Sequence, residues 1–437
     1  MDRPRDGAHL VVIGAGAAGL LAAATAARGG MRVTIIERNR EAGRKLLLSG
    51  KGRCNVTFDG TPAALVDGIP GNGRFLHSAF SLLGSSELRF HLARLGVETK
   101  VERGHRVFPV SDQAASVRDA LLEDCVTAGC AITYQRRVTR LEVVGGGGGR
   151  PQVAAALLEE GRRIPASAVL IATGGKSYPG TGSTGDGYQL AGALGHTVTG
   201  LTPSLVPLSC AEPWVKELTG LSLRNVRLTV APPGDRPARR RGTGSELGEM
   251  LFTHFGVSGP LVLRASREVA LRMAAGEPEV RLTVDLKPAL APDVLDQRLR
   301  RDLVARANRA VRNALADLAP AALVAVLLEL AGINPGARAN SVTRTQRWRL
   351  GTLVKGLPLT VTATRGFGEA IVTAGGIDVQ EVSPQTMESR LVDGLYFAGE
   401  VLDVDGYTGG YNLQAAFSTG YVAGRCAAAQ AGKGWSP

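Results

Sequence analysis

The sequence predicts an α/β fold: a discontinuous domain of parallel strands and helices, built from both ends of the chain and interrupted by an inserted β-barrel and a small helical subdomain. Residues 10–37 have the pattern of strand, glycine-rich turn, helix and strand. Residues 394–429 have that of a short buried strand and a helix rich in small residues. Between them, residues 196–287 contain short β-like runs broken by proline and glycine, and residues 288–332 have apolar residues at helical spacing.

The first strand, Leu10 to Ile13, leads directly into a G-x-G-x-x-G turn. The first glycine permits the tight turn, the second lets a pyrophosphate approach the backbone, and the third lets the helix pack on the strand. The second strand ends at Glu37, an acid suited to binding a ribose diol. This order of elements predicts a Rossmann-like site for an adenine dinucleotide, FAD or NAD(P). Its predicted turn residues are Gly14, Ala15, Gly16, Ala17, Ala18 and Gly19.

The segment after Glu37 is basic and punctuated by glycines at positions 43, 50 and 52. We interpret it as a loop that wraps a second set of phosphates or the polar edge of a ring, with a solvated basic loop as the alternative. Its basic residues include Arg38, Arg44, Lys45 and Arg53. Cys54 has no second cysteine nearby, which favours a packed or ring-adjacent thiol over a reactive one.

The next elements are a predicted amphipathic helix over 75–96, a hairpin, and a helix that ends near Asp124. Residues 137–168 read as a small antiparallel unit that begins at Val138, which we include among the cofactor contacts. A buried strand then ends in a tight turn, which is expected to pass beside the cofactor and contains Ala172, Thr173, Gly174 and Gly175. Residues 180–185 repeat the G-x-G-x-x-G spacing but do not leave a strand directly, so we reject them as a second nucleotide site.

The C-terminal block supplies the second half of the predicted site. Its strand is closed by Gly399 and Glu400, and Gly410 opens the following helix. The acid suits ribityl or phosphate-side hydroxyls, and the backbone N–H groups of residues 411–414 suit the N1–C2=O edge of an isoalloxazine ring. The two blocks together therefore predict one FAD site.

Composition limits the remaining classes. The net charge is +12, but the arginines are spread along the chain and the densest run, Arg236 to Arg241, sits between proline and glycine, so we expect no nucleic-acid partner. No apolar run reaches the length of a membrane span. Five cysteines without C-x-x-C spacing indicate no metal site and favour a reducing, cytoplasmic setting. The oligomeric state stays open.

Five motifs carry a resemblance over residues 8–430: KLLLSGKGRCNVT, FPVSDQAASVRDALL, ATGGKSYPGTGSTGDGY, GEMLFTHFGVSGP and GLYFAGEVLDVDGYTGGYNLQAAFSTGYVAG. Together they resemble the BaiN-like, aminoacetone-oxidase-like family of NAD(P)/FAD-dependent oxidoreductases. The resemblance implies an FAD-binding domain of residues 1–195 and 356–437. It also implies a β-barrel-like insert of 196–287 and 340–355, and a helical subdomain of 288–339. The cofactor residues that it adds or repeats are Lys45, Ser49, Gly50, Arg53, Cys54, Asn55, Thr173, Gly174, Gly399, Glu400, Asp403, Asn412, Leu413 and Gln414.

Three functions remain open at this stage. The leading one is an FAD-dependent reductase or dehydrogenase of a small molecule, such as a conjugated enone, with NAD(P)H visiting transiently as electron donor. The alternatives are an oxidase of a small amine or alcohol that uses dioxygen, and a flavin-bearing binding or sensor protein with little turnover. The candidate proton-transfer residues are His254, a lone histidine in an apolar stretch, with Tyr178 and Tyr411 as alternatives.

Overall fold

The computed structural model describes residues 8–145, 149–232 and 246–431. The basic run 236–241 and most of the glycine run 145–149 lie outside these residues. The chain divides into two compact units, Met1–Pro203 with Ala370–Pro437, and Ser204–Glu369.

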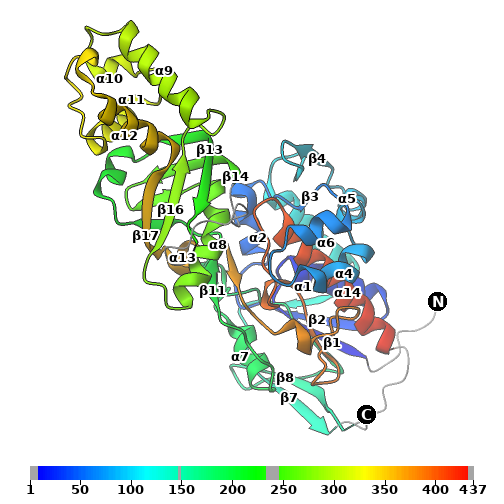
Figure 1. Ribbon diagram of the computed structural model, residues 1–437. Helices are drawn as coiled ribbons and strands as arrows, with labels where there is room; N and C mark the ends of the chain where they lie inside the picture. The colour runs from blue at the N-terminus through cyan, green and yellow to red at the C-terminus, as the bar shows by residue number, and fades with distance from the viewer. Residues whose placement is uncertain (1–7, 146–148, 233–245, 432–437) are drawn as a thin grey trace. The chain divides into compact units, whose positions relative to one another are not determined.

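A five-stranded parallel sheet forms the centre of the first unit (Figure 1). In spatial order its strands are β19 (Leu395–Phe397), β10 (Ala168–Ile171), β1 (His9–Ile13), β2 (Arg32–Ile36) and β6 (Ala131–Thr133). Every neighbouring pair is parallel, and the central strand β1 is buried along its length. A parallel sheet covered on both faces requires continuous apolar strands, which is why these short runs are so hydrophobic. The predicted Rossmann-like α/β fold is confirmed, with the C-terminal strand β19 paired to β10.

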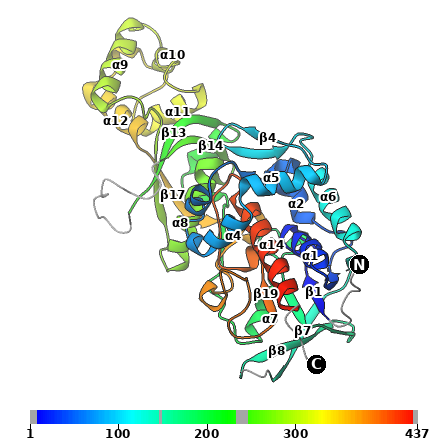
Figure 2. The same cartoon turned by 90° about the vertical axis from the view of Figure 1, so that its right-hand side faces the viewer.

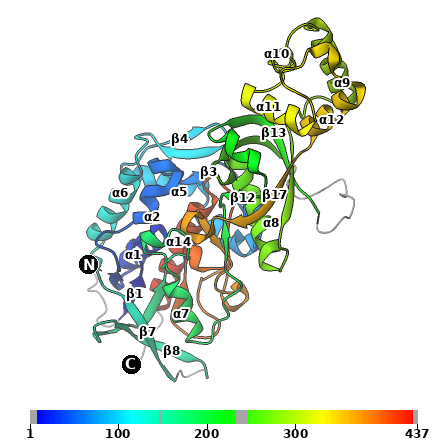
Figure 3. The same cartoon turned by 90° about the vertical axis from the view of Figure 1, so that its left-hand side faces the viewer.

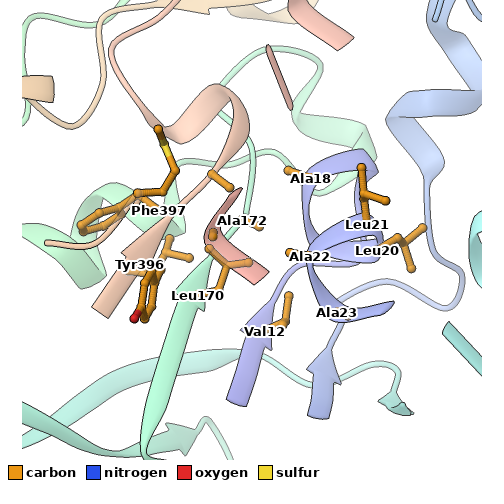
Figure 4. Packing of buried hydrophobic residues seen from close by; sticks show 14 of the residues in the cluster. Val12, Ala18, Leu20, Leu21, Ala22, Ala23, Leu170, Ala172, Tyr396 and Phe397 are labelled. Atoms are coloured by element: carbon orange, nitrogen blue, oxygen red, sulfur yellow. The ribbon is translucent and has the colours of Figure 1, made fainter. Parts of the chain in front are cut away.

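Two helices from opposite ends of the chain pack against each other beside this sheet. They are α1 (Ala17–Arg28) and α14 (Tyr411–Ala431), which lie side by side in Figure 2. A Cβ on Gly420 would lie 2.3 Å from the carbonyl oxygen of Ala18, and a Cβ on Gly424 would lie 2.3 Å from that of Ala22. Only glycine allows this approach. Figure 4 shows the alanines of α1 beside the apolar side chains of β10 and β19.

Three smaller sheets and several short helices complete the first unit. The sheets have the orders β3-β5-β4, β7-β8-β9 and β11-β18. The elements are α2 (Arg44–Leu48), η1 (Ser49–Gly52), β3 (Thr57–Phe58), α3 (Pro62–Asp67), η2 (Gly73–Leu76), α4 (His77–Leu82), α5 (Ser85–Arg94), β4 (Thr99–Glu102), β5 (Arg106–Pro109), α6 (Ala114–Thr127), β7 (Val138–Gly145), β8 (Pro151–Leu158), β9 (Arg163–Pro165), η3 (Pro179–Thr181), α7 (Asp186–Gly192), β11 (Thr202–Ser204), β18 (Val372–Ala374), η6 (Val379–Glu381) and η7 (Gly399–Val401).

The single helix predicted over 75–96 was wrong in detail. The segment is divided into η2, α4 and α5, with the break at Leu83 and Gly84. Gly84 adopts an extended conformation, and its N–H donates to the carboxylate of Glu87 at 3.1 Å. Apolar spacing runs through the break because both helices bury the same face, so the periodicity alone did not reveal it.

The second unit contains a closed barrel of strand order β12-β15-β14-β13-β16-β17. The strands are β12 (Leu208–Cys210), β13 (Ser222–Val230), β14 (Glu246–Thr253), β15 (Gly256–Ser258), β16 (Val280–Asp285) and β17 (Leu357–Thr364). Helix α8 (Pro260–Ala274), which follows β15 directly, was not predicted from the sequence. The other short helices of this unit are η4 (Pro213–Leu218), η5 (Ala339–Ser341) and α13 (Gly366–Glu369).

The remaining helices of this unit form a group of their own next to the barrel (Figure 3). They are α9 (Pro292–Ala305), α10 (Val311–Ala314), α11 (Ala321–Leu330) and α12 (Arg344–Lys355). Among the helices of the described residues, none combines the length and the hydropathy needed to cross a membrane.

Candidate functional site

The turn between β1 and α1 gives its three glycines different surroundings. Gly14 has a φ of 105°, and a Cβ there would lie 2.5 Å from the carbonyl oxygen of Ala172. A Cβ on Gly19 would lie 2.0 Å from the carbonyl oxygen of Gly14, so this glycine lets α1 pack on β1. A Cβ on Gly16 would meet nothing within 4 Å. The space in front of Gly16 is therefore open.

The N-terminus of α1 is suited to an anion. Gly16 occupies the N-cap position, no side chain caps the helix, and its first turn contains no acid. The first N–H groups of a helix have no partner within the helix, and the helix dipole places partial positive charge there. A phosphate in front of Ala17 and Ala18 would complete these hydrogen bonds.

Glu37, directly after β2, is held rigidly beside the same turn. Its carboxylate is only 6% exposed and accepts hydrogen bonds from the Ala15 N–H at 2.9 Å and the Asn39 N–H at 2.8 Å. The Asn39 side-chain amide donates a third bond at 2.7 Å. Asn39, two positions after Glu37, was not among the residues predicted from the sequence. These bonds hold the carboxylate in place beside the glycine turn.

An open hollow of about 420 Å³ adjoins this acid. It is lined by Arg38, Asn39, Arg40, Glu41, Arg44 and Gln135. Arg38 contacts Asp186 at 3.1 Å, and Arg44 contacts the Asn39 side-chain oxygen at 3.3 Å. Because three guanidinium groups face one carboxylate here, the hollow attracts anions such as the phosphate end of a dinucleotide.

Three segments distant in sequence converge on the carboxylate of Glu400. Lys45 donates to its carboxylate at 2.5 Å and to the Ser177 hydroxyl at 2.6 Å. Ser177 in turn donates to Glu400 at 2.8 Å, and the Thr373 N–H donates at 2.9 Å. Sequence reasoning missed Ser177 and Thr373. Ser177 lies two residues after Gly175, in the turn that follows β10, and Thr373 lies within β18, just before a Gly-Gly pair.

The loop after α2 has a strained backbone. Gly50, Lys51, Gly52 and Cys54 all have positive φ, between 56° and 84°. The Ser49 hydroxyl donates to the Leu46 carbonyl at 2.6 Å. Left-handed non-glycine residues cost free energy and concentrate at functional sites.

Arg53, Cys54 and Asn55, at the end of this loop, differ in the groups that a ligand could contact. Cys54 is fully buried, and burial raises the pKa of its thiol to about 12. Arg53 donates to Glu102 at 3.2 Å and to Asp112 at 2.9 Å, so protein acids occupy its guanidinium group. The side-chain oxygen of Asn55 is buried and has no hydrogen-bond partner in the described part of the chain. Asn55 therefore has an acceptor to spare.

The turn after β10 connects the glycine turn to the Glu400 cluster. The Ala172 N–H donates to the Ile13 carbonyl at 2.9 Å, and Gly174 has a φ of 74°. The Thr173 hydroxyl donates to the Gly174 carbonyl at 3.3 Å. A Cβ on Gly175 would lie 2.7 Å from the Glu400 carboxylate. Val138 is buried at the start of β7 and is paired with Leu158.

The start of α14 is fixed by its own side chains. The Asn412 side chain donates to the Gly406 carbonyl at 2.9 Å and accepts from the Gly406 N–H at 2.7 Å. Gln414 is fully buried, accepting from Thr57 at 2.5 Å and donating to the Leu83 carbonyl at 2.8 Å. Both side chains are used within the protein. In the first turn, which includes Leu413, the Gln414 N–H donates to the Gly410 carbonyl at 3.0 Å.

Other residues of this block mark close approaches of the backbone. Gly399 has a φ of 78°, and its N–H donates to the Thr419 hydroxyl at 2.9 Å. Gly410 has a φ of 104°, and a Cβ there would lie 2.3 Å from the carbonyl carbon of Thr57. The Asp403 carbonyl accepts from the Asn72 side chain at 2.7 Å.

The three candidate proton-transfer residues lie in different environments. Tyr178 is half-buried in the first unit, with a φ of 50°. Tyr411 is also in the first unit, and its ring stacks on Phe58 with centroids 4.8 Å apart. His254 is exposed in the second unit, in the turn between β14 and β15. The structure therefore brings the two tyrosines into the same unit as the glycine turn, and His254 into the other.

Known proteins resemble the chain over nearly its whole length. A family model described as "HI0933-like protein Rossmann domain" matches residues 8–426. A Clostridium scindens protein named 3-dehydro-bile acid delta(4,6)-reductase is 36% identical over 420 residues, covering 95% of this chain and 98% of that protein. An Escherichia coli protein named ribosomal RNA dihydrouridine synthase is 32% identical over 414 residues, covering 94% and 96%.

Solved structures show similarity of fold. A 3-ketosteroid delta1-dehydrogenase from Sterolibacterium denitrificans, in complex with 1,4-androstadiene-3,17-dione, superposes with a TM-score of 0.52 at 13% identity. The match covers 96% of this chain and 99% of that one.

Proposed function

Because the chain belongs to the HI0933-like Rossmann family of FAD-dependent oxidoreductases, we propose that it reduces a C=C bond conjugated with a carbonyl group, using NAD(P)H as electron donor. Bound FAD would supply hydride transfer. In the balanced reaction, NAD(P)H and one proton are consumed and NAD(P)⁺ is released. Hydride adds to the carbon β to the carbonyl and the proton to the α-carbon.

The residues of the first unit fit an FAD molecule. The open space at Gly16, the uncapped start of α1 and the fixed carboxylate of Glu37 suit the pyrophosphate and adenosine ribose. The spare acceptor of Asn55 and the first turn of α14 suit the polar edge of a ring. The convergence of both chain ends on Glu400 is the observation that carries the proposal, because it joins the halves of one extended site.

The names of the relatives support conjugate reduction as the shared chemistry. A steroid-type enone and the uracil ring of uridine both contain a C=C bond conjugated with a carbonyl group, and the two relatives are named for a reductase of the first and a synthase of dihydrouridine. A small enone is the first candidate substrate. A uracil base in RNA is the second, suggested by the name of the Escherichia coli relative.

NAD(P)H is proposed as a transient donor. The second G-x-G-x-x-G run, 180–185, begins inside η3 and leads into α7, and residues 172–179 separate it from the preceding strand β10. Arg38 and Arg137 both bind the neighbouring Asp186, so the groups around this run pair with each other. The nicotinamide would therefore visit the flavin from the substrate side.

Anaerobic mixing of the FAD-loaded protein with NADH or NADPH tests the donor. We expect the flavin absorbance at roughly 450 nm to decrease within a turnover time of about a second or less. Bleaching by a small amine with release of peroxide in air would instead indicate an oxidase. A protein that takes up no FAD would contradict the proposal altogether.

The proton to the α-carbon is proposed to come from Tyr178, Tyr411 or His254. The substitutions Tyr178→Phe, Tyr411→Phe and His254→Gln separate the three. The donor's variant is expected to lose about 10²- to 10⁴-fold in the rate of flavin reoxidation by substrate while keeping the rate of flavin reduction. A variant slowed equally in both steps would have lost cofactor positioning, which excludes its residue as the donor.

A further inference from the structure

The group of helices α9 to α12 carries a disproportionate share of the chain's charge. Residues 292–355 contain ten arginines and one lysine against four aspartates and one glutamate, a net charge of +6 out of the chain's +12. This stretch is about a seventh of the sequence. An excess of this size on a small module is the electrostatic signature of an anionic partner.

The outer face of α12 presents an aromatic side chain to solvent. Trp348 is 67% exposed, whereas Trp214 in the same unit is buried. Arg344 and Arg349 are exposed on the same helix, as are Thr345 and Thr352, whereas Leu350 and Val354 are buried. The amphipathic helix thus buries its aliphatic residues and leaves a tryptophan outside, so core packing does not explain Trp348.

Helix α9 adds positive charge beside this face. α9 and α12 lie side by side, joined by the ion pair of Asp296 with Arg347 at 2.7 Å (Figure 3). Arg344 and Arg300 also act on Asp296, and the hydrogen bond from Arg347 is the main cause that lowers the pKa of this carboxyl. One carboxylate therefore faces three guanidinium groups.

The arginines of this face are available to a ligand. In the described part of the chain, Arg300, Arg344 and Arg349 make no hydrogen bond or ion pair, and all three are exposed. Guanidinium groups bind phosphates, and an exposed indole stacks on a nucleobase, which together are the elements of a single-strand binding surface.

We propose that Trp348 with Arg300, Arg344 and Arg349 forms a surface that binds single-stranded RNA, the indole stacking on an unpaired base and the arginines contacting the flanking phosphates. A membrane surface fits less well, because the exposed neighbours of Trp348 on α12 are threonines and arginines, not further apolar residues. The choice of RNA over single-stranded DNA rests on the proposed chemistry, since uracil is the conjugated base.

Fluorescence anisotropy of a fluorescein-labelled oligouridylate of about twelve nucleotides tests this surface. We expect Trp348→Ala in the FAD-loaded protein to weaken binding by roughly 5- to 150-fold, the value of one lost base stack. The matched control is Phe90→Ala, which removes an equally exposed aromatic from the first unit and should leave the Kd unchanged.

A second pair of variants tests the charge. Arg344→Glu should weaken binding and reduce the magnitude of the negative slope of log association constant against log salt concentration by about 0.7 or more. The charge-matched Arg140→Glu in β7 should affect binding much less. A duplex RNA of similar length should bind more weakly and be insensitive to Trp348→Ala, because its bases are already stacked.

Several results would overturn the proposal. The first is an equal effect of Trp348→Ala and Phe90→Ala on RNA binding, and the second is no binding of oligouridylate at low salt. The third is that Trp348→Ala keeps its affinity for RNA but no longer binds phosphatidylserine vesicles or an acidic protein. The rate of flavin reduction by NAD(P)H in Trp348→Ala distinguishes failure of the RNA-binding proposal from failure of the proposed reaction. It should match the wild type, since Trp348 is assigned no part in the reduction.

Discussion

At the scale of single residues, the most informative feature is Glu37. Its carboxylate is buried and organised by three hydrogen bonds from Ala15 and Asn39, so it is positioned before any ligand arrives. Preorganised charged acceptors give strong, directional hydrogen bonds. The affinity for FAD should therefore depend on this charge more than on the exposed charges around it.

We expect Glu37→Gln to weaken FAD binding by roughly 10- to 150-fold, the cost of losing a hydrogen bond to a charged group. Titration of the apoprotein with FAD, followed by flavin fluorescence, measures the Kd. Glu123→Gln, an exposed acid in α6 outside the predicted site, is the control and should change the Kd little. Equal effects of the two substitutions would remove Glu37 from the site.

Cys54 provides a second residue-scale prediction. Because burial raises the pKa of its thiol to about 12, the thiolate is absent at pH 8 and the residue should not react with a disulfide reagent in the folded protein. Native wild type and Cys54→Ser should release equal amounts of thionitrobenzoate, and differ by one equivalent only after unfolding. Faster native labelling of the wild type would show that the thiol is accessible.

His196 should make folding stability depend on pH. It contacts Glu381 at 3.0 Å and Ser389 at 2.8 Å, and burial lowers its pKa below the usual 6.5. The unfolded chain therefore takes up the proton first as the pH falls, and the free energy of unfolding should decrease from pH 6.5 downward. In urea unfolding at pH 7.5 and 5.5, His196→Gln should show a smaller difference between the two conditions than the exposed-site control His77→Gln.

At the scale of elements, the contact of α1 with α14 is the joint between the two ends of the chain. Gly420→Ala places a methyl group against the Ala18 carbonyl and should destabilise the protein by about 1–3 kcal/mol in urea unfolding. Gly351→Ala, inside α12 with only ordinary contacts, should have the opposite sign, a gain of about 0.5–1 kcal/mol. Equal effects of both substitutions would mean that α1 and α14 are less closely packed than the structure has them.

The strands and helices that the sequence predicted best are those whose pattern is local. The run from Leu10 to Ile13 and the glycines that follow it define β1 and the start of α1 without reference to any other segment. The break at Gly84 was missed because apolar residues continue at helical spacing across it, and α8 was missed because it lies between short strands in a stretch that was interpreted as β-structure throughout. A local pattern cannot report which tertiary contacts interrupt it.

Part of the candidate site could not be predicted for the same reason. Ser177 and Thr373 lie 196 positions apart and meet only because β10 and β18 end near Glu400. The family resemblance placed Arg53 and Gln414 among the cofactor contacts, and in the structure their side chains bind protein partners. The tryptophan at 348 passed unnoticed because exposure is a property of the folded helix.

At the scale of the whole molecule, the division into two units makes the first unit a candidate for independent folding. β11 pairs with β18, so the chain leaves and re-enters the first unit at neighbouring strands. We expect residues 1–203 joined to 370–437 through a short Gly-Ser linker to fold and bind FAD. If this shortened protein has the circular dichroism of a folded helical protein but takes up no FAD, the second unit is needed for the site.

The central claim is that reduced flavin in this protein transfers its hydride to a conjugated C=C bond. The most direct test is anaerobic double mixing, in which NAD(P)H first bleaches the flavin and a substrate is then added. A steroid-type enone, or a uridine-containing RNA, is expected to restore the flavin absorbance. For each flavin reoxidised, one C=C bond of the substrate should be reduced to a single bond. Reoxidation by dioxygen alone, with neither substrate restoring absorbance or losing its double bond, would contradict it.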